Sequence, residues 1–160
     1  MNTVSLVQEA IRLKEEAARI KEPFHEIWCA FDRDSFPAQN FNRAFQLAKD
    51  NRIFVAWANE SFEIWYLLHF HYHDTGISRA EYGNRLSTLL GCQYDKADDL
   101  IYAKLESRQS TAIKNARRLE GHWVEMGNRW TPENANPSTS IHKLIERLNQ
   151  FKAIGAAETE

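Results

Sequence analysis

Residues His25–Asp34, with the sequence HEIWCAFDRD, form an apolar run that ends in two aspartates separated by a single residue. We predict that the run is a β-strand, in which Asp32 and Asp34 project from the same face because side chains on a strand repeat every two residues. Two carboxylates at a strand end suit Mg²⁺, which prefers oxygen ligands and is commonly held by one or two carboxylates. The alternative is that the aspartates only end the strand and open a polar loop.

The segments around this strand predict a parallel sheet. A helical pattern precedes the strand and stops at Pro23, residues 41–50 have a second helical pattern, and residues 53–58 form another short apolar run. A strand, a helix and a strand in this order form a parallel crossover. Ligands of such sheets bind beyond the carboxyl ends of the strands. We therefore expect Asp32, Asp34 and Asn59 to lie at one edge.

The next segment, residues 60–70, is almost continuously apolar and predicts a buried helix. Glu63 is the exception, and two interpretations of it stay open. A carboxylate in the first turn interacts favourably with the helix dipole, and Asn59 could cap the same end. Glu63 could instead turn toward the aspartates as an outer ligand or a base.

From residue 78 onward the pattern is helical. We expect helices at 78–91 and 96–125, a loop at 127–137, and a last helix that opens at Asn136-Pro137-Ser138 and continues through Phe151. The predicted fold is an α/β domain in which a small parallel sheet with a strand-helix-strand core is followed by a helical C-terminal half. The predicted boundaries are 1–153 for the single domain, 1–75 for the α/β core, 78–153 for the helical part and 154–160 for a disordered tail.

The outer face of the 96–125 region is locally basic. Cations along a helix can contact the phosphates of a nucleic acid. A solvated helix face has a similar composition, so this alternative also stays open. The candidate nucleic-acid-binding residues are Lys104, Arg108, Lys114, Arg117 and Arg118.

The composition is that of an ordinary globular protein, with 43% hydrophobic and 26% charged residues in a chain of 160. A net charge of −2 and a pI near 6.3 exclude a general attraction to nucleic acid or anionic membranes, so such a partner would need a local patch. The two cysteines match no metal or redox spacing, which suits a reducing compartment. With no leader pattern and no span of about 20 apolar residues, we expect a cytoplasmic protein without membrane contact.

Three stretches of the sequence are similar to the RloB-like family, which resembles Toprim-type domains. They are WCAFDRD at 28–34, ANESFEIWYLLHF at 58–70, and NPST at 136–139 ahead of an amphipathic helix. The resemblance implies a Mg²⁺- or Mn²⁺-dependent nuclease of prokaryotic phage defence, associated with abortive infection, that acts on DNA or RNA with an ATPase partner. It also implies that Asp32 and Asp34 hold the metal, that Glu63 assists in catalysis, and that Asn59 lines the same edge.

The sequence departs from the family pattern in two places. No strand precedes the first helix, so the glutamate that an earlier strand-to-helix loop supplies in Toprim-type sites has no counterpart. Glu60 and Ser61 stand where proline and cysteine are common in the family. Either the chain is a nuclease subunit that is short at its N-terminus, or it is a non-catalytic module that docks an ATPase or nucleic acid. An open sheet edge would also allow a homodimer.

Overall fold

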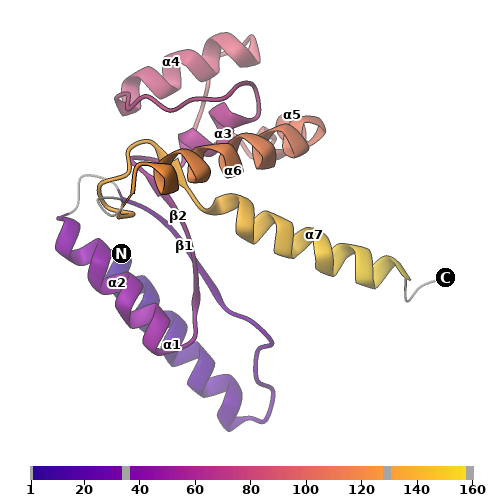
Figure 1. Cartoon of the computed structure of the whole chain (residues 1–160). Helices are drawn as coiled ribbons and strands as arrows, with labels where there is room; N and C mark the ends of the chain where they lie inside the picture. Colours follow the sequence, from indigo (N-terminus) through magenta and orange to yellow (C-terminus); the bar gives the residue numbers. More distant parts are fainter. Residues whose placement is uncertain (1, 34–36, 128–130, 158–160) are drawn as a thin grey trace.

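Two parallel strands form the centre of the molecule (Figure 1). The structure is a computed structural model that describes residues 2–33, 37–127 and 131–157, with the side chains described as far as residue 154. The elements in chain order are α1 (Thr3–Arg19), β1 (Trp28–Asp32), α2 (Ala38–Asp50), β2 (Phe54–Asn59), α3 (Glu63–Leu68), α4 (Arg79–Leu90), α5 (Ile101–Leu105), the 3₁₀ helix η1 (Glu106–Arg108), α6 (Gln109–Glu125), β3 (Ser138–Thr139) and α7 (Ile141–Ala157).

The sheet confirms the predicted strand-helix-strand core. β1 and β2 run parallel, with Trp28 opposite Phe54 and Asp32 opposite Ala58, and α2 connects them. A third strand, β3, pairs antiparallel with the other edge of β2 at Ala58 and Asn59. The sequence analysis did not predict β3, because two residues are too few to show a strand period. The strand order is β1-β2-β3.

Helices cover both faces of the sheet. α1 and α2 lie side by side on one face (Figure 1), where Val7, Cys29 and Ala44 share an apolar cluster. The opposite face carries α3, α6 and α7, with Ala56, Leu67 and other buried residues in a second cluster. Neighbouring residues of each strand therefore contribute to different cores, which explains why both strands are apolar up to their last residues, Asp32 and Asn59.

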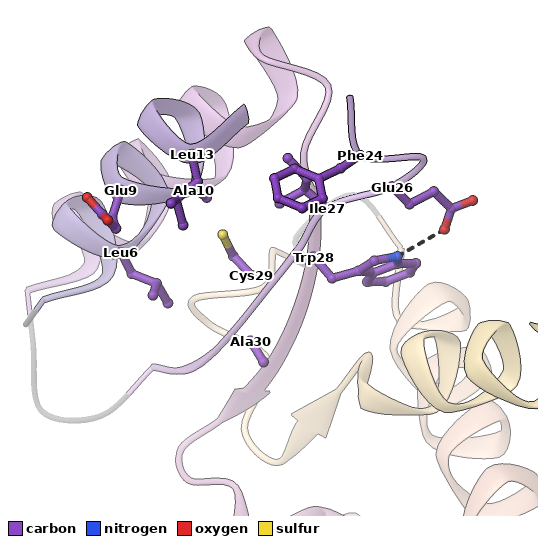
Figure 2. Close-up of a pocket in the computed structure, with 10 residues that line it drawn as sticks. All are labelled: Leu6, Glu9, Ala10, Leu13, Phe24, Glu26, Ile27, Trp28, Cys29 and Ala30. Carbon is purple, nitrogen blue, oxygen red and sulfur yellow. Dashed lines mark hydrogen bonds between the residues drawn. The ribbon is translucent and has the colours of Figure 1, made fainter. Parts of the chain in front are cut away.

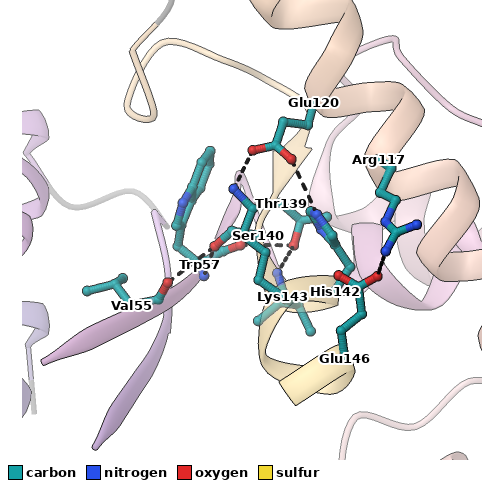
Figure 3. A network of polar contacts seen from close by, with 10 residues as sticks. Val55, Trp57, Arg117, Glu120, Thr139, Ser140, His142, Lys143 and Glu146 are labelled. Carbon is teal, nitrogen blue, oxygen red and sulfur yellow. Dashed lines mark hydrogen bonds and ion pairs between the residues drawn. The ribbon is translucent and has the colours of Figure 1, made fainter. Parts of the chain in front are cut away.

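The junction of β3 and α7 is tied to β2 by polar contacts (Figure 3). The Ser140 amide donates to the Trp57 carbonyl at 2.8 Å, and the Trp57 amide donates to Ser140 Oγ at 3.0 Å. Thr139 Oγ1 also donates to the Trp57 carbonyl, at 2.9 Å. Because these groups are buried, their pairing satisfies backbone atoms that would otherwise be costly to remove from water. The chain thus closes this edge of its own sheet.

The helical half begins as predicted and then differs in detail. Ser78 caps α4 through the Glu81 amide, and Gly91 ends it in the left-handed conformation with φ of 70°. The expected 96–125 helix is divided into α5, η1 and α6. Just before α5, the Asp95 side chain accepts a hydrogen bond from the Ala97 amide and the Asp98 side chain accepts one from the Leu100 amide. Such local bonds compete with a helix and delay its start.

The last helix also has other bounds than the sequence predicts. β3 occupies Ser138–Thr139, so α7 starts at Ile141, and its backbone continues to Ala157, beyond the expected domain boundary at 153. Apolar residues on its first turns pack on the sheet, and the helix then extends away from the strands (Figure 1). In the part of the chain that the structure describes, no helix has the length and apolar character needed to cross a membrane.

Candidate functional site

The carboxyl edge of the two parallel strands carries the candidate site. Asp32 is the last residue of β1, and its register partner Ala58 is followed by Asn59 at the end of β2. The structure therefore places Asp32 and Asn59 at the same edge, as the crossover predicts. Asp34, the second aspartate of the predicted pair, lies outside the described residues.

Asp32 is partly accessible and has a cationic neighbour. Its side chain is 26% exposed, and Arg79 Nη2, from the first residue of α4, lies 3.3 Å from its Oδ2 atom. An ion pair this exposed is weak, because water and salt screen it. A divalent cation could therefore compete with Arg79 for the Asp32 carboxylate.

Asn59 is buried and anchors a loop. Its Nδ2 atom donates to the carbonyl oxygens of Pro132 and Glu133, at 3.0 Å and 3.2 Å. It does not cap the following helix, because Phe62 holds the N-cap position of α3 and makes no side-chain capping bond. The expectation that Asn59 caps this helix is therefore wrong. Its amide nitrogen is committed to the loop, so only its Oδ1 atom could serve a cation.

Glu63 is a buried carboxylate at the start of α3. Ser61 Oγ donates to its Oε2 atom at 2.7 Å, and the Tyr94 hydroxyl donates to its Oε1 atom at 3.1 Å. Burial raises the pKa of Glu63, but the Ser61 bond, the backbone amide of Glu63, the charge of Lys96 and the Tyr94 bond together lower that pKa below its ordinary value of 4.5. Glu63 is therefore charged at neutral pH.

The Glu63 charge in turn shapes its surroundings. Burial and then the charge of Glu63 raise the pKa of Tyr94 and that of Tyr66. Tyr82 is fully buried on α4, and its hydroxyl has no hydrogen-bond partner among the described residues. Burial and then the charge of Glu60 raise the pKa of Tyr82. All three phenols therefore stay protonated at neutral pH.

The predicted site residues are not joined directly to one another. Among the described residues, no hydrogen bond or ion pair connects Asp32, Asn59 and Glu63, and each has other partners. The same residues, which leave out Asp34, include no group of three His, Cys, Asp or Glu side chains that could hold a metal ion. The described part of the edge thus supplies one accessible carboxylate and one amide oxygen.

The five candidate phosphate contacts fall into three kinds of environment. Arg108 lies over the Phe70 ring at 5.0 Å and Arg118 over the Tyr72 ring at 3.8 Å. Two others are paired with carboxylates, and Lys114 is exposed on α6. The paired residues are Lys104, which contacts Asp98 at 2.6 Å, and Arg117, which contacts Glu146 of α7. The five residues lie on three elements, α5, η1 and α6, so no single helix carries all of them.

The comparisons with known proteins bear on the family of the chain. A family model described as RloB-like protein matches residues 1–148. The chain belongs to the RloB-like family. No curated protein and no solved structure gives a significant match. The match confirms the family to which the FDRD and NESFE stretches pointed.

The oxygen atoms at this edge of the RloB-like chain are of the kind that a hard divalent cation binds. Asp32 offers a carboxylate that water can reach, and Asn59 offers an amide oxygen at the same edge. Mg²⁺ accepts such oxygens and completes its octahedral shell with waters and substrate phosphates. The fit rests on oxygen chemistry and on position at the sheet edge.

Sequence reasoning missed the partners that hold the RloB-like site together. Ser61 stands close to Glu63 in the sequence, and a hydroxyl beside an acid at a helix start is a signal that could have been used. Tyr94 and Arg79 are remote from the residues they contact, so only the packing of α3 and α4 brings them there.

Proposed function

We propose that this RloB-like chain is a magnesium-dependent nuclease subunit of a prokaryotic phage-defence system. The observation that carries the proposal is the position of Asp32 beside Asn59 at the carboxyl edge of two parallel strands, where α/β proteins bind their ligands. Asp32 and Asp34 would hold Mg²⁺ or Mn²⁺ there. The bound cation would polarise a phosphoryl group and lower the pKa of a water molecule.

The side chains of the edge have separate tasks in this proposal. Asp32 binds and orients the cation through its accessible carboxylate. Asn59 fixes the end of β2 against the Pro132–Glu133 loop, which keeps the edge rigid. Glu63 has a lowered pKa and is charged, so at neutral pH it can accept a proton but not donate one. We therefore assign it the role of a base or of an electrostatic support, rather than of an acid.

The same proposal includes a nucleic-acid surface and a partner. Arg108, Lys114 and Arg118 are exposed, and two of them lie over aromatic rings. Guanidinium groups and rings of this kind can contact phosphates and stack on bases. Lys104 and Arg117 could join them, because exposed ion pairs are weak enough for phosphate to displace. The ATPase partner is proposed from the family resemblance, and the cytoplasmic setting is proposed from the cysteines, whose spacing suits a reducing compartment.

A second candidate function is a non-catalytic docking module. The observation that favours it is that Asp32, Asn59 and Glu63 each have a partner within the protein, respectively Arg79, the Pro132–Glu133 loop and the pair of hydroxyls. Side chains that are bonded within the protein in this way can have a purely structural role. In that case the helical half would bind an ATPase or nucleic acid without hydrolysis.

Calorimetry separates the two functions. Mn²⁺ and Mg²⁺ are titrated into the native chain, into an Asp32→Asn and Asp34→Asn double variant, and into a matched Asp99→Asn control on the exposed α4–α5 connection. We expect binding by the native chain and by the control, and loss of binding in the double variant. Metal-dependent cleavage of DNA or RNA should follow the same order. Absence of metal binding in the native chain, or equal binding in all three, contradicts the proposed nuclease site.

A further inference from the structure

The Asp32 side chain lies on the face of the sheet that the helical half covers. Figure 2 shows Cys29 pointing toward α1 and Trp28 pointing away from it. Because side chains alternate along a strand, Asp32 lies on the same face as Trp28. Trp28 packs against the cluster that α3, α6 and α7 share, and α4 packs against α3. The first residue of α4, Arg79, thereby reaches Asp32.

The contact between Arg79 and Asp32 is long for an ion pair. Arg79 Nη2 lies 3.3 Å from Asp32 Oδ2, whereas charge-assisted hydrogen bonds of this kind are commonly about 2.7–2.9 Å long. Arg147 and Glu26 show a tighter pair in the same molecule. Arg147 Nε donates to both Glu26 carboxylate oxygens, at 2.9 Å and 3.1 Å, and Nη2 donates to one of them at 2.5 Å.

Solvent also reaches the Arg79–Asp32 pair more easily. The two side chains are 41% and 26% exposed, compared with 31% and 17% for Arg147 and Glu26. Water and salt screen an exposed ion pair, so it contributes little to stability. Exchange of Arg79 for another cation at Asp32 therefore costs the protein little.

The Arg79 guanidinium can bind a phosphate as well as a carboxylate. Its N–H groups form a planar fork that matches either anion. Arg79 also stands in the first turn of α4, where the helix dipole favours a negative charge. The acid of this turn, Glu81, is paired with Arg85 at 2.5 Å, which offsets its charge.

We propose that Arg79 exchanges its anion when a divalent cation binds at Asp32. The cation takes over the Asp32 carboxylate, and the Arg79 guanidinium binds a phosphate of the nucleic-acid strand. Each charge keeps a partner throughout this exchange. Arg79 is thus a substrate-binding residue that metal binding makes available. The inference rests on the proposed nuclease function and adds to it a coupling between the metal and the strand, in which each strengthens the binding of the other.

A purely structural role of Arg79 predicts a different result. If the pair only ties α4 to β1, removal of the guanidinium would lower stability and would not improve metal binding. If Arg79 competes with the cation, the same removal improves metal binding and weakens the binding of a strand only when metal is present. Affinities for metal and strand therefore separate the two roles, and urea unfolding of each variant measures the structural contribution.

The first measurement is calorimetry with Mn²⁺ on the native chain, on Arg79→Gln and on Arg85→Gln. Arg85 is the matched control, because it lies on the same helix and is 40% exposed, but its partner is Glu81. We expect Arg79→Gln to bind Mn²⁺ about two- to fivefold more tightly than the native chain, since an exposed competitor has been removed. Arg85→Gln should change the affinity by less than about twofold.

The second measurement is fluorescence anisotropy with labelled single strands of DNA and of RNA. Their phosphorothioate linkages resist hydrolysis, and binding is compared in Mn²⁺ and in a chelator. We expect Arg79→Gln to weaken strand binding about tenfold in Mn²⁺ and less than about twofold in the chelator. Arg79→Lys keeps the charge without the fork, so its loss in Mn²⁺ should be smaller. Arg85→Gln should have the same small effect in both conditions.

The possible results distinguish the two proposals. Absence of Mn²⁺ binding in the native chain overturns the proposed metal site and the exchange together. Three results overturn the exchange alone and leave the metal site in place. They are Mn²⁺ binding that is not tighter in Arg79→Gln than in Arg85→Gln, absence of strand binding by the native chain in Mn²⁺, and a loss of strand binding in Arg79→Gln that is equal with and without metal.

Discussion

At the scale of single residues, Glu63 shows how a carboxylate stays charged in a largely buried position. Two hydroxyls, from Ser61 and Tyr94, donate to its two oxygens. Hydrogen bonds to a charged group are worth more than neutral ones, and a buried charge left without them is costly. The pair of hydroxyls therefore makes Glu63 a fixed negative charge at the start of α3, whichever function the edge serves.

Removal of one hydroxyl should destabilise the protein. We expect Tyr94→Phe to lower the free energy of unfolding at neutral pH by about 1–3 kcal/mol, because Glu63 keeps its charge and loses a donor. The pKa of Glu63 should rise in the same variant. Urea unfolding and carboxyl carbon NMR measure the two effects. Tyr102→Phe, whose hydroxyl meets the exposed Glu106, is the matched control. Equal effects of the two substitutions would contradict the assigned role of Tyr94.

At the scale of elements, the Ser140 side chain contributes two of the contacts that close the edge of β2. Ser140 Oγ accepts from the Trp57 amide at 3.0 Å and contacts the Val55 carbonyl at 3.4 Å. The residue stands between β3 and α7, so it holds the start of that helix on the sheet (Figure 3).

The Ser140→Ala substitution should loosen this junction. It leaves the buried Trp57 amide without its acceptor, so we expect a loss of about 1–3 kcal/mol in the free energy of unfolding. Ser110→Ala, on the exposed face of α6, should change stability little. Chemical denaturation compares the two variants, and amide exchange at Trp57 should accelerate only in Ser140→Ala. An unchanged exchange rate of the Trp57 amide would show that its hydrogen bond to Ser140 Oγ does not hold this junction together.

The elements also show how far the sequence determines the structure. The apolar runs of β1 and β2 and the Ser78 and Gly91 caps of α4 are local signals, and the structure confirms them. The late start of α5 at Ile101 was missed because side chains of Asp95 and Asp98 compete with the helix. β3 was missed because its pairing with β2 is non-local. At the site, the shared position of Asp32 and Asn59 could be predicted from the order of strands and helix. The contacts of Tyr94 and Arg79 could not, because they depend on how the helices pack.

At the scale of the whole molecule, three buried histidines make the fold sensitive to acid. Burial lowers the pKa of His69, His73 and His142 below the ordinary value of 6.5, and for His142 the charge of Glu120 only partly opposes this effect. The unfolded chain therefore takes up these protons more readily than the folded one. The stability that the neutral histidines support is present above about pH 6.5 and is lost as the pH falls.

We expect the free energy of unfolding to decline between about pH 7.5 and about pH 5.5, with a separate decline below about pH 4.5 as Glu63 loses its charge. Replacement of a buried histidine, as in His73→Asn, should flatten the first decline, whereas exposed His25→Gln should not. Urea midpoints measured across this range provide the test. A stability curve that is flat between about pH 7.5 and about pH 5.5 in the native chain would contradict the effect of the histidines.

The closure of β2 by Ser138–Ser140 also sets the order in which the chain can be completed during its synthesis. Trp57 and Ser140 are 83 residues apart, and the whole helical region from α3 to α6 lies between them. A ribosome releases the N-terminal part of a chain first, and contacts between distant residues form last. The second edge of β2 therefore stays open until residues 138–140 have emerged, so this small sheet is completed only after the whole region from α3 to α6 has been synthesised.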